Sequence, residues 1–205
     1  MDTITVQTLK QFGACDTAEF AALYPQGYNV AWLWGSPAER AAGWRALLGD
    51  PFLRRHVGWA IEVGLLPVRI VANLRGADLT DANLTAADLT GGDLTDANLR
   101  GADLTRANLT GADLTDAHLA GANLRGADLR VADLTGGDLT DADLRGADLT
   151  RANLTRADLT DAHLRGANLR TANLTDADLT GADLTGADLT RANLTPANLA
   201  GATLT

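Results

Sequence analysis

The sequence predicts a mainly β protein in which residues 71–205 form a solenoid and residues 1–70 form a small α-helical N-terminal domain or cap. From Leu74 to Leu204 every fifth residue is Leu, which gives 27 leucines in register. Ala precedes nearly every one of these leucines by two positions, and Asp or Asn precedes it by one. All nine aromatic residues lie between Phe12 and Trp59, so the composition changes near residue 71. Such a fixed period is typical of repeat architectures.

A period of five residues excludes both a straight helix and a flat strand. In an α-helix, five steps of about 100° place successive leucines about 140° apart around the axis, so no face is buried. In a strand, an odd step sends successive leucines to opposite faces. The five-residue word A-[DN]-L-[TR]-x instead requires a corner once per word, with Leu and Ala inward. Coils stacked ~4.8 Å apart then pair their backbones and create the core that no single word possesses.

The words of this region resemble those of a known family. Ala182-Asp183-Leu184-Thr185-Gly186 and its neighbours match the A-[DN]-L-x-x motif of the pentapeptide-repeat family over residues 72–205. The resemblance implies a right-handed quadrilateral β-helix with four words per coil, and by that count 27 words make about seven coils. Members of this family do different things, so the resemblance predicts the fold and leaves the function open.

The first 70 residues contain the start and stop signals of short helices. Residues 16–19 and 36–39 have capping-box spacing, and the helices that they begin are expected to end near Pro25 and Gly49. A third helix is expected from Asp50 to Gly64, and residues 8–12 add a possible short first helix. We expect these helices to cover the first coil, because an exposed coil edge invites strand pairing.

Composition excludes several classes of protein. A single Cys rules out an intrachain disulfide, and the N-terminus lacks the basic and apolar regions of a signal peptide. No apolar run reaches the ~18 residues of a membrane span. We therefore expect a cytoplasmic protein that does not bind membranes. The entire net charge of −9 comes from residues 72–205, with 20 Asp against 11 Arg, which argues against direct binding of nucleic acid.

The repeats offer little chemistry for catalysis. Residues 72–205 contain no Ser, Cys, Lys, Tyr or Glu, so we expect neither an enzyme nor a cofactor. His118 and His163 are two and a quarter coils apart on adjacent faces and cannot share a zinc ion. The Asp or Asn before each Leu is expected to bond to turn backbone. Weak cation binding by stacked aspartates and water ordering by a Thr ladder are minor alternatives.

Charged residues mark a candidate interaction surface. With four words per coil, one face carries a strip of five aspartates and another face carries a stripe of three arginines: Asp93, Asp96, Asp113, Asp116 and Asp133, and Arg125, Arg145 and Arg165. The main hypothesis is a rigid, non-enzymatic protein-binding or scaffold module whose partner the sequence does not identify.

The resemblance supplies an alternative hypothesis, because some pentapeptide-repeat proteins bind DNA gyrase as acidic mimics of DNA and protect it from topoisomerase poisons. A duplex of ~32 Å carries about 19 negative charges, whereas this chain has a net charge of −9. The chain also lacks the central Phe residues and the C-terminal dimerising segment of the gyrase-binding members.

The last words keep their leucines and have no helix after them. Leu194, Leu199 and Leu204 would therefore leave an apolar cross-section uncovered. Burial of a Leu side chain contributes roughly 1.5–3 kcal/mol. We expect a homodimer joined through the C-terminal coils, with twofold symmetry closing the assembly.

Overall fold

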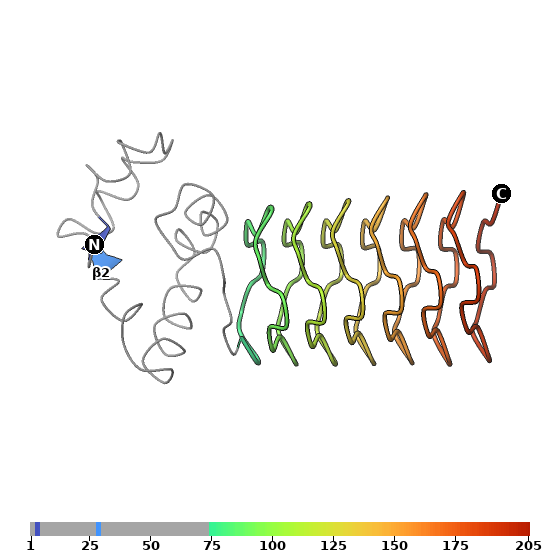
Figure 1. Cartoon of the computed structure of the whole chain (residues 1–205), viewed down its shortest axis with the longest axis horizontal. Coiled ribbons are helices and arrows are strands. Elements are labelled where there is room, and N and C mark those ends of the chain that lie inside the picture. Colours follow the sequence, from blue (N-terminus) through green and yellow to red (C-terminus); the bar gives the residue numbers. More distant parts are fainter. Residues whose placement is uncertain (1–2, 5–27, 30–73) are drawn as a thin grey trace.

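The computed structural model describes residues 3–4, 28–29 and 74–205 (Figure 1). Strands β1 (Thr3–Ile4) and β2 (Tyr28–Asn29) form a short antiparallel pair, with Thr3 opposite Asn29 and Ile4 opposite Tyr28. The sequence did not predict this pair. The helices expected within residues 1–70, the boundary near residue 70 and the capping role lie outside the described residues.

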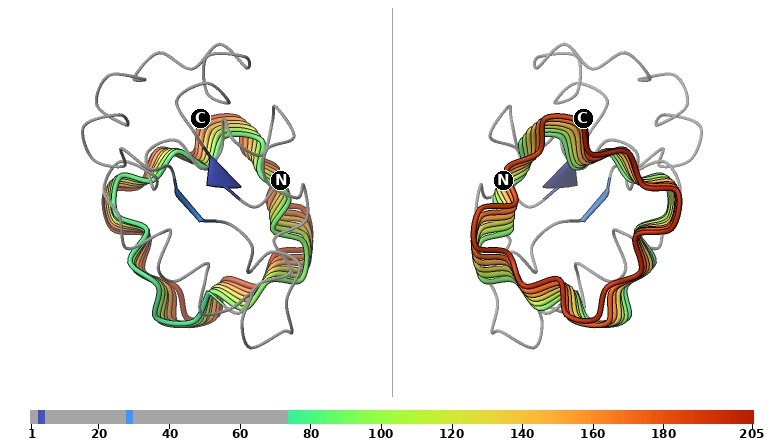
Figure 2. Two further views of the ribbon diagram at one scale, coloured as in Figure 1. Left: turned by 90° about the vertical axis from the view of Figure 1, so that its left-hand side faces the viewer. Right: turned by 90° about the vertical axis from the view of Figure 1, so that its right-hand side faces the viewer.

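Residues 74–205 form a continuous coil with a period of 20 residues. Parallel bridges join each second-position residue of a word to its counterpart 20 residues later, from Asp78 with Asn98 to Asp183 with Thr203. Four words therefore complete one coil, and successive coils superimpose into a four-sided outline around the axis (Figure 2). This confirms the quadrilateral β-helix. We name each face after its first leucine: the Leu74, Leu79, Leu84 and Leu89 faces follow one another around the coil. A column is one word position on one face in successive coils.

In most interior words, each backbone amide has a hydrogen-bond acceptor. The first residue donates to the Leu carbonyl of the preceding word and closes a β-turn, and the second donates to the coil before. The third and fifth residues donate to the coil after, and the fourth donates to the side chain of the second. In the word 112–116 the five distances are 3.0, 2.9, 2.6, 3.0 and 2.9 Å, in word order. The coil thus satisfies its buried donors, as a folded backbone must.

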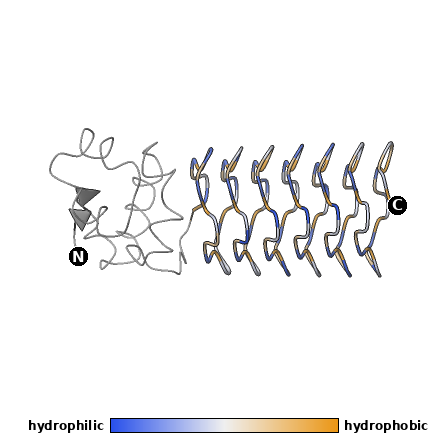
Figure 3. Cartoon of the chain, turned by 90° about the horizontal axis from the view of Figure 1, so that it is seen from above, coloured by the Kyte–Doolittle hydropathy of each residue, from blue (hydrophilic) through white to orange (hydrophobic). Residues whose placement is uncertain are grey.

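The core consists of leucine and alanine columns. Every central leucine from Leu74 to Leu184 is at most 1% exposed, and the first-position alanines of the same coils are buried as well. Hydrophobic and hydrophilic stretches recur at the same places in successive coils (Figure 3). The inward direction of Leu and Ala predicted from the five-residue period is therefore confirmed.

The fifth residue of each word occupies the left-handed region of backbone conformation. From Gly76 to Gly201, every fifth-position residue except Pro196 has a φ between 54° and 73°. A turn closed in this way needs a positive φ at its third residue, as type II turns do. Gly adopts that angle freely, and Asp tolerates it, whereas a β-branched side chain is strained there. Val131 holds a φ of 60° and is 53% exposed, so it has the strain without compensating burial.

The Val131 column provides a matched test of this strain. Gly111 lies one coil earlier in the same column, and a Cβ added to it would meet no heavy atom within 4 Å. We expect Val131→Gly to raise the free energy of unfolding by about 1 kcal/mol and Gly111→Val to lower it by a similar amount, because left-handed backbone costs a residue with a Cβ about that much. Denaturant unfolding followed by circular dichroism measures both changes. A Val131→Gly protein less stable than the original would show that the Val side chain contributes more than its backbone conformation costs.

Candidate interaction surfaces

The aspartates and asparagines at the second position are first of all structural. The Oδ1 atom of Asp113 accepts the backbone N–H of Thr115 at 3.0 Å and the Thr115 hydroxyl at 2.7 Å. The hydrogen bond from the Thr115 hydroxyl holds the pKa of Asp113 below its usual value, against the opposing effect of partial burial. The same pattern recurs through the β-helix, as the sequence predicted. One oxygen of each such carboxylate is therefore occupied, and its direction is set by the turn.

The predicted acidic strip does assemble on the Leu74 face. Asp113 bridges to Asp93 on the coil before and to Asp133 on the coil after. Asp96 and Asp116 follow at exposed fifth positions, one coil apart. Beyond Asp133 the same column contains asparagines. Each donates from Nδ2 to a Thr hydroxyl oxygen of the coil before: Asn153 to Thr135 at 2.8 Å, Asn173 to Thr155 at 2.9 Å and Asn193 to Thr175 at 2.8 Å. The strip therefore covers only the first part of this face.

The Leu79 face is more acidic than the Leu74 face, which carries the strip. The sequence interpretation did not identify the Leu79 face as acidic. Sorted by face, the words of the Leu74 face carry six Asp and two Arg, whereas those of the Leu79 face carry seven Asp and one Arg. The seven aspartates of the Leu79 face are Asp78, Asp81, Asp138, Asp141, Asp158, Asp161 and Asp178. These two adjacent faces thus hold a net charge of −10. Reading every fourth word together would have found the second face from the sequence alone.

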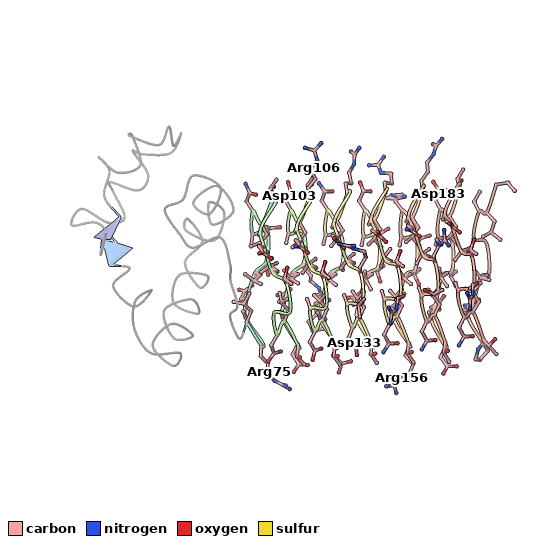
Figure 4. The ribbon with its side chains drawn as sticks, viewed as in Figure 1. Arg75, Asp103, Arg106, Asp133, Arg156 and Asp183 are labelled. Carbon is pink, nitrogen blue, oxygen red and sulfur yellow. The ribbon has the colours of Figure 1, made fainter. Side chains whose placement is uncertain are left out.

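The predicted arginine stripe lies on the Leu84 face, opposite the acidic strip. Arg125, Arg145 and Arg165 occupy one column on successive coils. Arg106 projects from the side of the rod that carries Asp103 and Asp183, away from Asp133 and Arg156 (Figure 4). The words of the Leu84 face carry four Arg and three Asp, and those of the Leu89 face carry four of each. These two faces together have a net charge of +1.

Within the stripe only Arg145 has an ion pair among residues 74–205. Its Nε and Nη2 atoms donate to the two oxygens of Asp143 at 2.8 and 2.5 Å. The hydrogen bond from the Arg145 side chain lowers the pKa of Asp143, against partial burial. Arg125 and Arg165 form no ion pair within the described part of the chain. The stripe therefore keeps unneutralised guanidinium groups on an acidic protein.

The two minor alternatives gain no support from the geometry. The hydroxyls of the Thr column on the Leu74 face, such as those of Thr135 and Thr155, donate to second-position side chains. They are therefore engaged rather than free to order water. Across residues 74–205 and the β1–β2 pair, no group of three or more His, Cys, Asp or Glu residues could hold a metal ion. No helix in the described part of the chain is long and apolar enough to cross a membrane.

The final coil is more exposed than the coils before it. Leu184 is 1% exposed, whereas Leu194 and Leu199 are only partly buried and Leu204 is 54% exposed. These three leucines thus lie in the last coil that the structure describes, near the end marked C in Figure 1, and they are more exposed than the central leucines.

Comparisons with known proteins agree with this architecture. A family model for pentapeptide repeats matches in eight copies, over residues 72–101, 97–136, 112–151, 132–176 and 172–205. HetL, a pentapeptide repeat protein involved in heterocyst differentiation regulation in the cyanobacterium Nostoc sp. strain PCC 7120, is 44% identical with a TM-score of 0.63. That match covers 64% of this chain and 61% of HetL, so the chain spans about three-fifths of HetL's length.

Two further structures are similar. The pentapeptide repeat protein Rfr23 from the cyanobacterium Cyanothece 51142 is 33% identical with a TM-score of 0.51, over 52% of this chain and 86% of Rfr23. QnrB1, a plasmid-mediated fluoroquinolone resistance protein, is 22% identical with a TM-score of 0.39, over 63% of this chain and 78% of QnrB1. A comparison with curated proteins finds no match. The repeat model matches throughout residues 72–205, and the chain belongs to the pentapeptide-repeat family.

Proposed function

We propose that this chain is a non-enzymatic binding protein whose β-helix presents a rigid acidic surface to a protein partner with a complementary basic surface. The observation that carries the proposal is the charge division: the adjacent Leu74 and Leu79 faces hold −10, whereas the other two faces hold +1. A charge division of this kind steers a partner of opposite charge and sets the orientation in which it docks.

The rigidity of the surface supports the same proposal. The backbone of most interior words is fixed by five hydrogen bonds, and each second-position carboxylate accepts the N–H of the residue two positions later. The fifth-position aspartates, among them Asp96, Asp116 and Asp141, are exposed and project from turns of fixed geometry. A surface organised before binding loses little conformational entropy when a partner docks. Residues 72–205 also lack Ser, Cys, Lys, Tyr and Glu, the usual nucleophiles and bases apart from Asp and His.

The fifth position allows the charge to be removed with the turn kept, at the loss of one exposed ion pair, between Asp96 and Arg75. A triple variant of Asp96→Gly, Asp116→Gly and Asp141→Gly places at each turn the residue that suits a positive φ. A matched control changes the fifth-position arginines of the other two faces, in Arg106→Gly, Arg151→Gly and Arg191→Gly. We expect the immobilised aspartate variant to lose cellular proteins that the original chain retains at low salt, and the arginine variant to keep them. Retention of the same proteins by both variants would contradict a role for the acidic faces.

The acidic faces also favour a second candidate function, a mimic of DNA that binds DNA gyrase. Residues 74–205 form a rod of roughly 32 Å, at about 4.8 Å for each 20-residue coil. A duplex of that length carries about 19 charges around its whole circumference. A partner contacts only one side of a duplex, and the −10 of two adjacent faces is comparable with that share. The arginines of the other faces would then point away from the enzyme.

An assay of DNA supercoiling tests this candidate directly. If the chain is a mimic, we expect micromolar protein to inhibit supercoiling by gyrase or to protect the enzyme from a quinolone. The triple aspartate variant should be weaker by at least about tenfold, since three charges that steer and hold the partner are lost. Absence of both effects for the original chain would exclude gyrase and leave the general binding function standing.

The exposed final coil supports a separate proposal, a homodimer joined end to end through Leu194, Leu199 and Leu204. Mutual burial of these side chains would remove apolar surface from water, and a twofold contact would close the assembly. We expect light scattering at tens of micromolar to give a dimer mass, and the double variant Leu199→Thr and Leu204→Thr to give a monomer. Val131→Gly removes an equally exposed apolar side chain from the side of the rod and serves as control. A monomer mass for the original chain would refute the dimer.

A further inference from the structure

The Leu84 face contains a basic hollow. Its volume is about 330 Å³, and it is lined by Thr105, Arg106, Asn123, Arg125, Gly126 and Arg145. Three of these six residues carry a positive charge and none is acidic. A concentration of guanidinium groups around a concave surface is unexpected on a protein whose net charge is −9.

The hollow lies where the repeat is interrupted, and for this reason it is not simply repeated along the rod. Arg106 is the one charged residue in the fifth-position column of this face, where Gly126, Gly146, Gly166 and Gly186 follow it. A Cβ built on Gly126 would lie 3.8 Å from Cγ of Arg106. The bare turn at Gly126 therefore forms the floor of the hollow beneath the Arg106 side chain. The glycines further along the column have no neighbouring atom within 4 Å of such a Cβ, and so lack this wall.

Several hydrogen-bond donors around the hollow have no acceptor within the described part of the chain. Arg106 and Arg125 form no ion pair there, and Arg145 already binds Asp143. The Oδ1 atom of Asn123 accepts the backbone N–H of Arg125 at 3.3 Å, which leaves the NH₂ group of the same amide as a donor. Two guanidinium groups and one amide can therefore donate to a ligand. The lining itself contains no carboxylate, and both oxygens of Asp143 beside it are bound by Arg145.

We propose that this hollow binds a short chain of phosphate groups, such as a triphosphate. The planar guanidinium group of Arg pairs with phosphate through two parallel hydrogen bonds, and several arginines together match a ligand of several negative charges. A volume of about 330 Å³ is at the lower end for small-molecule sites and is too small for a macromolecule. The lining contains no aromatic or aliphatic residue that would favour an apolar ligand.

The net charge of the protein does not prevent this binding. The Leu74 face lies across the rod from Arg106 (Figure 4). The Leu79 face adjoins the Leu84 face, but its words beside Arg106 and Asn123, residues 97–101 and 117–121, contain no Asp. Charges further apart than about 8 Å are largely screened at physiological ionic strength. The arginines are exposed, so binding is salt-dependent and weakens as the salt concentration rises.

Calorimetric titration of the full-length protein with inorganic triphosphate at low salt tests the proposal. We expect one site per chain. Arg106→Gly and Gly126→Asp should each weaken binding by at least about tenfold, because the first removes a charged donor and the second places a carboxylate on the floor. Both substitutions use residues that the same turn position accepts elsewhere, as at Gly146 and Asp116, so the fold is retained.

Matched controls separate the hollow from the general charge of the protein. Arg156→Gly removes an arginine from the same turn position on the opposite face, and Gly111→Asp adds a carboxylate to the same position on the Leu89 face. Both control variants should bind triphosphate as the original chain does. Absence of binding to the original chain, or an equal loss in the control variants, would overturn the site. Equally tight binding of citrate would overturn the assignment to phosphate.

Discussion

The turn that ends each five-residue word is the constraint on which the rest of this structure depends. It is closed by a hydrogen bond from the next first-position amide to the Leu carbonyl, and it requires a positive φ at the fifth residue. Because the chain changes direction at every such turn, each Leu and each Ala points to the axis and four words return the chain to its starting face. The pairing of the coils, the core and the four faces all follow from this repeated turn.

The same constraint distinguishes surface positions whose side chains support the turn from surface positions whose side chains can vary. Where the second residue is Asp or Asn, its side chain accepts the fourth residue's N–H and so supports the turn, whatever else it does. The fifth residue needs only a tolerable positive φ, and it is mostly Gly, Asp or Arg, with Ala86, Val131, Thr171 and Pro196 once each. Surface chemistry is therefore determined at the fourth and fifth positions and by the choice between Asp and Asn at the second. A regular framework of this kind can change its binding surface without changing its fold.

The charge pattern shows how such variation can produce two different surfaces on one rod. Two adjacent faces carry most of the negative charge, and on the Leu84 face, opposite the Leu74 face, Arg106 precedes a column of glycines and forms a wall of a basic hollow. The acidic faces carry charge on successive coils, as suits a macromolecular partner, whereas the hollow has the size of a small ligand. The two surfaces point in different directions, so a partner and a small anion could be bound at the same time.

The sequence alone determined the β-helix. One leucine in every five residues is incompatible with an α-helix or a flat strand, and it leaves only a chain that turns once per word. The sequence also predicted the acidic strip at Asp93, Asp113 and Asp133 and the arginine stripe, since the family resemblance supplied the four words per coil. The hollow beside Arg106 was decided only by the tertiary structure. Its walls come from successive coils, and their approach depends on stacking, on the left-handed turn at Gly126 and on which guanidinium groups are already paired with a carboxylate. None of these is a property of the local sequence, because each depends on residues about 20 positions apart.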